Sequence, residues 1–197
     1  MTQTLNKPID QRFTHSGISW QQFKSIQEGF SDSSGIRLFY YRGEVEILAV
    51  SQDHEIFSCL IGILLAEYFV EKGIEFTPTG SFTQERVGVV SAQADKSYFI
   101  GKVGTTPDLS IEVVFTSGTV SKLNRYWELG VPEVWFWEDG LFTLHHLRKE
   151  GYERIYRSEV LPDLDIDLLT RCVLMSSRVE AVREFRKAIS QQEGNRE

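Results

Sequence analysis

The segment SQDHEIFSCLIGILLAEYFVEKG, residues 51–73, places the strongest constraint on how this chain can fold. Its apolar residues cover most of the circumference of a helix, which is typical of a helix that other elements pack against on several sides. Ser51 or Asp53 provides an N-cap, and Gly73 provides a C-terminal stop. The apolar run between these ends contains Glu67 and is short for a transmembrane helix. The sequence therefore predicts a long core helix.

Shorter patterns predict the other elements of the chain. Helices are expected at residues 19–29, 119–130 and 168–189, and strands within residues 36–50, 74–84, 95–100, 108–115, 131–147 and 152–169. This irregular order indicates an α+β domain with a mixed sheet, because a regular winding would alternate strand and helix. We expect residues 18–190 to form one domain, with a flexible N-terminal arm at 1–17 and a flexible tail at 191–197.

The composition excludes one class of function and indicates a compartment. The net charge of −7 argues against a protein that coats nucleic acid through a basic surface, although metal ions could supply the positive charge in a nuclease. Cys59 and Cys172 lie in apolar surroundings without a metal-binding spacing, so both are expected to be buried thiols in a reducing compartment. The first residues lack the apolar stretch of a signal peptide. We therefore expect a cytoplasmic protein that does not associate with a membrane.

The strand PDLSIEVVF, Pro107–Phe115, carries two acids on one face. Alternate residues from Leu109 onward are apolar and face a core, while Asp108 and Glu112 lie on the opposite face. That face is either a solvated side of a sheet or one wall of a metal site. Residues four apart on a straight strand are about 13 Å apart, whereas a metal ion binds oxygen ligands at about 2.0–2.6 Å. Glu112 therefore needs a partner from another strand.

Asp95 is the nearest candidate for that partner. The segments DKSYFI and DLSIEVVF are joined by a glycine-containing connection, which favours an antiparallel pair with opposed Cβ atoms about 4.5–5.5 Å apart. This pairing would bring Asp95 close to the residues from Glu112 to Val114, with Asp108 nearer to the turn. Lys122 follows on the next helix, and a lysine beside a metal-bound phosphate can orient the attacking water. These residue types are typical of a phosphodiesterase that uses Mg²⁺ or Mn²⁺.

Several segments together resemble the Uma-type family of restriction endonucleases, a divergent branch of the PD-(D/E)XK nuclease superfamily. They are GEVEILAVSQDHE, ADKSYFI, PDLSIEVVFTSG, KLNRYWELGVPEVWFW and LPDLDIDLL, and the resemblance covers residues 18–175. It implies a restriction-endonuclease-like core, in which helices flank a central mixed β-sheet and the metal site lies on adjacent strands. It also implies that Glu112 takes the second acidic position of the motif. Val114 stands where the lysine is expected, so that role passes to Lys122.

The same resemblance implies the remaining site residues. Asp95 or Asp108 would be the first acid, and Glu46, or with less support Glu44, would be an additional acid on the strand before the long helix. In this chain Gln93 and Ala94 replace the Glu-Pro that the family has before Asp95.

We therefore predict a metal-dependent endonuclease that hydrolyses DNA phosphodiester bonds with a metal-activated water. Asp95, Asp108 and Glu112 would hold the ion, Lys122 would assist the water and the phosphate, and Glu46 would complete the site. DNA as the substrate follows from the resemblance alone, and a homodimer would suit the cutting of both strands. The alternative is a catalytically weak or inactive nuclease-fold protein that acts as a binding or regulatory module.

Two other features are expected to have structural roles. His54, in the first turn of the long helix, is expected to be a capping or surface residue. The aromatic residues Trp135, Phe136, Trp137 and Phe142 alternate along a hairpin, so they are expected to pack in a core or at a dimer contact instead of stacking on bases.

Overall fold

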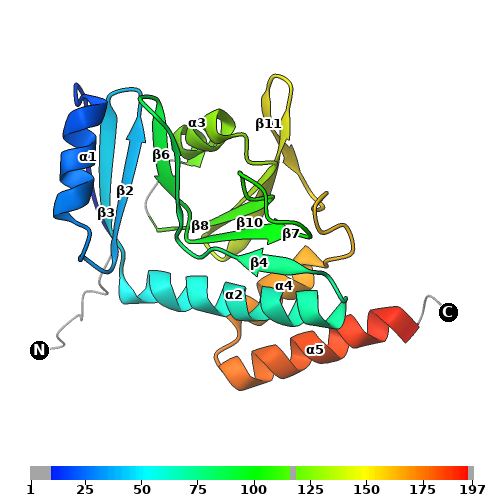
Figure 1. Cartoon of the computed structure of the whole chain (residues 1–197). Helices are drawn as coiled ribbons and strands as arrows, with labels where there is room; N and C mark the ends of the chain where they lie inside the picture. The colour runs from blue at the N-terminus through cyan, green and yellow to red at the C-terminus, as the bar shows by residue number, and fades with distance from the viewer. Residues whose placement is uncertain (1–9, 116–118, 195–197) are drawn as a thin grey trace, which may run out of the picture.

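The computed structural model describes residues 10–115 and 119–194, which form a mixed α+β fold with two β-sheets (Figure 1). The helices of these residues are α1 (Trp20–Gly29), α2 (Gln52–Glu71), α3 (Thr119–Leu129), α4 (Ile166–Leu174) and α5 (Arg178–Gly194). None of them is both long enough and apolar enough to span a membrane.

The first sheet is antiparallel and has the strand order β1-β3-β2-β6-β5. Its strands are β1 (Gln11–His15), β2 (Ile36–Tyr41), β3 (Glu44–Ala49), β5 (Thr83–Arg86) and β6 (Val90–Gln93). This sheet contains β6, which the sequence pattern did not predict. The division of the strands into two separate sheets was not predicted either, because periodicity identifies strands but not the sheet that each one joins.

The second sheet is mixed and has the order β11-β10-β9-β8-β7-β4. Its strands are β4 (Phe76–Pro78), β7 (Lys96–Ile100), β8 (Leu109–Val114), β9 (Glu133–Glu138), β10 (Leu141–Arg148) and β11 (Gly151–Ile155). Only β8 and β9 run parallel, and α3 connects them. The predicted α+β class with a mixed sheet is therefore confirmed.

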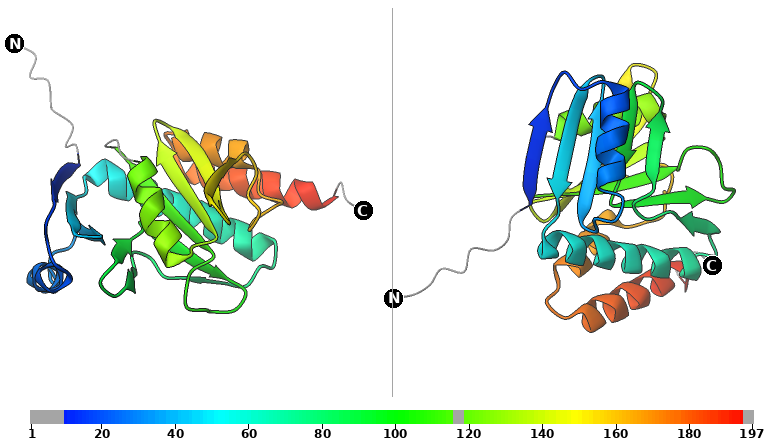
Figure 2. Two further views of the ribbon diagram at one scale, coloured as in Figure 1. Left: turned by 90° about the horizontal axis from the view of Figure 1, so that it is seen from above. Right: turned by 60° about the vertical axis from the view of Figure 1, so that its left-hand side comes forward.

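The two sheets and the helices form successive layers with three apolar cores (Figure 2). Helix α1 covers the outer face of the first sheet, where Phe23 packs against Leu38 and Tyr40. The central core lies between the inner face of the first sheet, the second sheet and α3, and it contains Phe39 and Phe136. Helices α2, α4 and α5 cover the other face of the second sheet. Strand β8 is consequently buried on both faces.

Local sequence signals account for several element boundaries. Ser19 and Gln22 form the capping box of α1, in which each side chain accepts a backbone N–H of the other residue. Ser51 is the N-cap of α2, and its hydroxyl oxygen accepts the N–H of His54. Asp139 and Gly140 form the β9–β10 turn with φ of 51° and 79°, as a tight hairpin turn requires. Each of these interactions lies within a few residues of the chain, so the local sequence is sufficient to specify it.

The predicted N-terminal arm is partly wrong, because Gln11–His15 form β1 on the edge of β3. All five side chains of this strand are exposed. Backbone hydrogen bonds to β3 and the ion pair of Arg12 with Glu46 hold it, so it lacks the alternating apolar pattern from which a strand is recognised. Residues 1–9 lie outside the described residues.

The predicted final helix is also wrong in its extent, because it is two helices. Helix α4 ends at Leu174, and its C-cap residue Met175 is extended, with φ of −65° and ψ of 137°. Helix α5 then begins after Ser177, whose hydroxyl oxygen accepts the N–H of Glu180. It runs to Gly194 and so includes part of the predicted flexible tail. The Ser176-Ser177 dipeptide therefore acts as a break and a new N-cap.

Three further predictions concern burial. Trp135, Phe136, Trp137 and Phe142 are buried, which confirms that the hairpin aromatics pack in a core. Cys172 is buried as expected, but Cys59 is exposed. The prediction for Cys59 was wrong because one face of α2 stays uncovered in the fold.

Candidate functional site

The pairing of β7 with β8 brings Asp95 next to Glu112. The strands are antiparallel, as predicted, with Lys96 opposite Ile111 and Ser97 opposite Ser110. One further step in this register places Asp95 opposite Glu112. The Oδ2 atom of Asp95 also accepts the N–H of Val113 at 2.7 Å. The two acids therefore form the centre of the site, although they come from different strands.

Helix α3 supplies two donors to Glu112. The Nζ atom of Lys122 donates to Oε2 at 3.0 Å, and the hydroxyl group of Tyr126 donates to Oε1. Residues four apart lie on one face of a helix, so both side chains reach the same carboxylate. Burial raises the pKa of the Glu112 carboxyl, and the charge of Lys122 acts in the opposite direction. Lys122 therefore lies within reach of the acid on β8, paired with it directly, and Tyr126 is an additional residue of the cluster.

His54 connects Asp95 to a third carboxylate. Its Nδ1 atom lies 2.8 Å from Oδ2 of Asp10, and its Nε2 atom lies 2.9 Å from Oδ1 of Asp95. The other oxygen of Asp10 accepts the N–H of Ser51 at 2.7 Å. The expectation of a surface or capping role was wrong, because the His54 side chain is fully buried between two acids.

The two acids set the charge of His54. Burial opposes the charged ring, but the hydrogen bonds and charges of Asp10 and Asp95 outweigh this effect and raise the pKa of His54 to about 9. Burial likewise acts to raise the pKa of Asp10, but the hydrogen bonds from His54 and Ser51 lower it. His54 is therefore an imidazolium at neutral pH, and it neutralises part of the negative charge around Asp95.

Glu46 lies on the first sheet and is bound by two arginines. Its Oε2 atom accepts from Arg125 of α3 at 2.6 Å and from Arg12 of β1 at 2.9 Å. Burial acts to raise the pKa of Glu46, but the charge and hydrogen bond of Arg125 outweigh it. Arg125 and Lys122 both lie over the ring of Phe39, at 4.7 and 6.0 Å from its centroid. Helix α3 thus connects Glu46 to the cluster around Glu112.

Asp108 makes its contacts away from this cluster. Its Oδ2 atom accepts the N–H of Ile100 at 2.8 Å, and its own N–H donates to the carbonyl oxygen of Tyr98. These bonds close the connection between β7 and β8, which is the turn role that the sequence left open for Asp108. The structure therefore brings together Asp95, Glu112 and Lys122 but leaves Asp108 at the far end of the strand pair.

Asp95 and Glu112 are the two carboxylates in this cluster that could hold a hard divalent cation. Each oxygen of Asp95 and Glu112 already faces a donor, but a carboxylate oxygen has two lone pairs and retains capacity to accept. Mg²⁺ commonly binds one or two carboxylates and keeps several waters. In residues 10–115 and 119–194, no group of three or more His, Cys, Asp and Glu side chains is placed to hold a metal ion. The structure thus brings together two of the three acids that the sequence predicted as metal ligands.

Sequence reasoning missed Asp10, Tyr126 and Arg125 as members of the site. The spacing of Lys122 and Tyr126 was a usable signal, because the two residues lie one helical turn apart. Asp10 gave no comparable signal, since it reaches His54 across 44 positions of the chain.

No protein-family model matches this chain, and no curated protein matches it. Its function is therefore argued from the residues and geometry of the site.

The Glu46–Arg125 pair provides a test of how strongly α3 is held to the first sheet. We expect Glu46→Ala to lower the free energy of unfolding by about 3–5 kcal/mol, because it leaves a buried guanidinium without its charge partner. Urea denaturation measures this loss. Glu159→Ala is the matched control, since its partner Arg148 is exposed and solvent screens such a surface pair, so the loss should be small. Equal losses in the two variants would contradict the buried ion pair.

Proposed function

We propose that this protein is a metal-dependent endonuclease with a restriction-endonuclease-like core, and that it hydrolyses DNA phosphodiester bonds. The observation that supports this most is the placement of Asp95 beside Glu112 on adjacent strands, with Lys122 at 3.0 Å from Glu112. The mixed sheet, with α3 joining the parallel strands β8 and β9, suits the same proposal. The Uma-type resemblance in the sequence points to DNA as the substrate.

Each residue has a separate role in this proposal. Asp95 and Glu112 would hold Mg²⁺ or Mn²⁺, which when bound supplies an activated water and neutralises charge on the phosphate. Lys122 would leave Glu112 and place its ammonium group against the phosphate oxygens. Before the site opens, Tyr126 holds the Glu112 carboxylate in position through its hydroxyl group. Glu46, through Arg125, sets the position of the helix that carries Lys122 and Tyr126.

The burial of the site sets a condition for this activity. Glu112 is 1% exposed, Lys122 3% and Asp95 4%. A phosphodiester can reach these groups only when α3 moves away from the strands, because α3 carries the side chains that cover Glu112. The proposed reaction therefore includes an opening step. In this step the hydrogen bonds from Lys122 and Tyr126 to Glu112 would break, so that the metal ion and the substrate could enter the site.

A binding or regulatory module without catalysis is the second candidate. It is favoured by the balance of charge in the site, where His54 and Lys122 already neutralise Asp95 and Glu112. A carboxylate pair that is matched by internal cations has less electrostatic attraction for a metal ion. In this candidate the cluster would be a structural connection between α2, α3 and the strands.

A plasmid assay distinguishes the two candidates. We expect the wild type to nick supercoiled DNA with Mn²⁺ and to stop when a chelator is added. Lys122→Met should lower the rate by about 100-fold or more, because it removes the positive charge beside the phosphate.

Lys24→Met is the matched control for the plasmid assay, because Lys24 lies on α1 and pairs with Glu85. The same assay on single-stranded RNA tests the choice of substrate, and sedimentation tests the proposed homodimer. A wild type that cuts neither nucleic acid with any divalent metal would establish the second candidate.

A further inference from the structure

Helix α2 has an outward face without charged residues. The side chains along this face are Ile56, Cys59, Ile63, Ala66 and Val70, at alternating intervals of three and four residues. Ile56 is 38% exposed, Ile63 49% and Val70 72%. The other faces of α2 pack on β8, α4 and α5. An apolar row of this length is unusual on a helix that faces solvent and marks a binding surface.

A groove of about 410 Å³ runs beside this row. The helix side is lined by Cys59, Gly62, Ile63 and Ala66, and the sheet side by residues of β4, β7 and the segment after β4. Phe76 and Pro78 provide apolar walls there, and β4 is the edge strand of the second sheet. The volume and the apolar lining are in the range of sites that bind small molecules.

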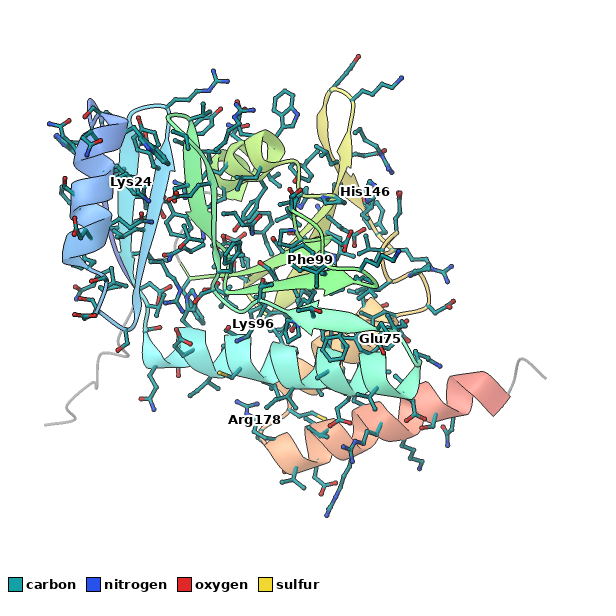
Figure 3. The ribbon with its side chains drawn as sticks, viewed as in Figure 1. Lys24, Glu75, Lys96, Phe99, His146 and Arg178 are labelled. Atoms are coloured by element: carbon teal, nitrogen blue, oxygen red, sulfur yellow. The ribbon has the colours of Figure 1, made fainter. Side chains whose placement is uncertain are left out.

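Two polar side chains converge on the groove from β7. A Cβ atom at position 62 would lie 3.2 Å from Cε of Lys96 and 3.6 Å from the hydroxyl oxygen of Tyr98. The side chain of Lys96 therefore packs against α2 at Gly62, where no side chain is in the way. Figure 3 shows Lys96 on the α2 side of the sheet. Burial raises the pKa of the Tyr98 phenol, so its hydroxyl group remains a hydrogen-bond donor.

The charge in the groove comes from one residue. Of the described residues, Lys96 is the only charged one that lines the groove, and no acidic side chain there neutralises it. A single cation beside an apolar wall is complementary to an anion with an apolar body.

We propose that this groove binds a small carboxylic acid with an apolar chain. The carboxylate would accept from the amine of Lys96 and the hydroxyl group of Tyr98, and the chain would lie along Ile63, Ala66 and Phe76. The groove is on the α2 side of the second sheet, and Glu112 faces α3 on the other side. This proposal therefore does not depend on the proposed nuclease activity.

Cys59 provides a native reporter for this site. It lines the groove and is exposed, whereas Cys172 is buried. We expect decanoate, below its micellar concentration, to slow the reaction of Cys59 with a thiol-reactive disulfide at least tenfold at saturation. Calorimetry should give one site per chain. Decanol has the same chain without the charge, and it should bind at least tenfold more weakly.

Two variants on opposite walls test the role of Lys96. Lys96→Met should lower the affinity for decanoate at least tenfold and leave the affinity for decanol unchanged. Lys102 is an exposed lysine after β7, and Lys102→Met should change neither affinity. Gly62→Ala should also weaken decanoate, because the new methyl group would displace the Lys96 chain. Alanine is the better helix former, so this variant is expected to fold.

Three results would overturn the proposal. Equal affinity for decanoate and decanol would show that the charge of Lys96 has no part in binding. Unchanged decanoate affinity in both Lys96→Met and Gly62→Ala would show that decanoate does not bind in this groove. A stable dimer that protects Cys59 without ligand, and that Ile63→Asp separates, would show that a second copy of the chain covers this face.

Discussion

Glu112→Gln is expected to abolish metal binding and nicking while leaving the protein folded. Loss of a residue that only supports a metal ligand lowers metal affinity about 10–100-fold, so loss of a ligand should lower Mn²⁺ affinity at least about 100-fold. The amide oxygen of glutamine can still accept from Lys122, and its NH2 group can donate to the hydroxyl oxygen of Tyr126, which keeps the contacts of α3. Calorimetry with Mn²⁺, with plasmid nicking in parallel, measures both effects.

Asp108→Asn is the matched control for that experiment. It makes the same change of carboxylate to amide on the same strand pair, but the Asp108 side chain binds the N–H of Ile100 at the far end of the strand pair. We expect this variant to bind Mn²⁺ as the wild type does. If Asp108→Asn loses the metal and Glu112→Gln keeps it, the site lies at the β7–β8 connection and the proposed assignment of ligands is wrong.

The second large effect is a loss of stability at alkaline pH. The pKa of His54 rises from 6.5 to about 9 on folding, because Asp10 and Asp95 bind the charged ring. A raised pKa means that the folded state binds the proton more tightly, so the stabilisation is complete below pH 6.5 and is lost as pH rises through 9. The rise corresponds to about 3 kcal/mol. Urea denaturation at a series of pH values between 6 and 10 measures it.

Variants of His54 and its partner identify the group responsible. In His54→Gln the fall in stability between pH 6.5 and 9 should disappear, and in Asp10→Asn it should move to lower pH because one of the two carboxylates is gone. His15→Gln, which changes an exposed histidine of β1, should keep the wild-type profile. A wild type whose stability is constant from pH 6.5 to 9 would contradict a charged His54 in the folded state.

The parts of the fold that depend on near neighbours in sequence were predictable. The capping box at Ser19, the N-cap at Ser51 and the turn at Asp139-Gly140 are each complete within a few residues. Strand β1 was missed because its side chains are all exposed, so burial leaves no pattern in them. The division into two sheets was missed for a related reason, since strand partners are chosen by packing of the whole chain.

Within the site, the sequence by itself determined that acidic residues and a lysine would be present, and that Asp95 would lie close to Glu112. The alternation of side chains along β8 placed Glu112 on the face opposite to its apolar neighbours Ile111 and Val113. The short connection between β7 and β8 predicted an antiparallel pair, in which Asp95 lies close to Glu112. Tertiary structure alone decided which residues neutralise these acids. Asp10 meets His54, and Arg125 meets Glu46, across 44 and 79 positions of the chain. Such contacts form because a buried charge needs a partner, and any element that packs nearby can supply one.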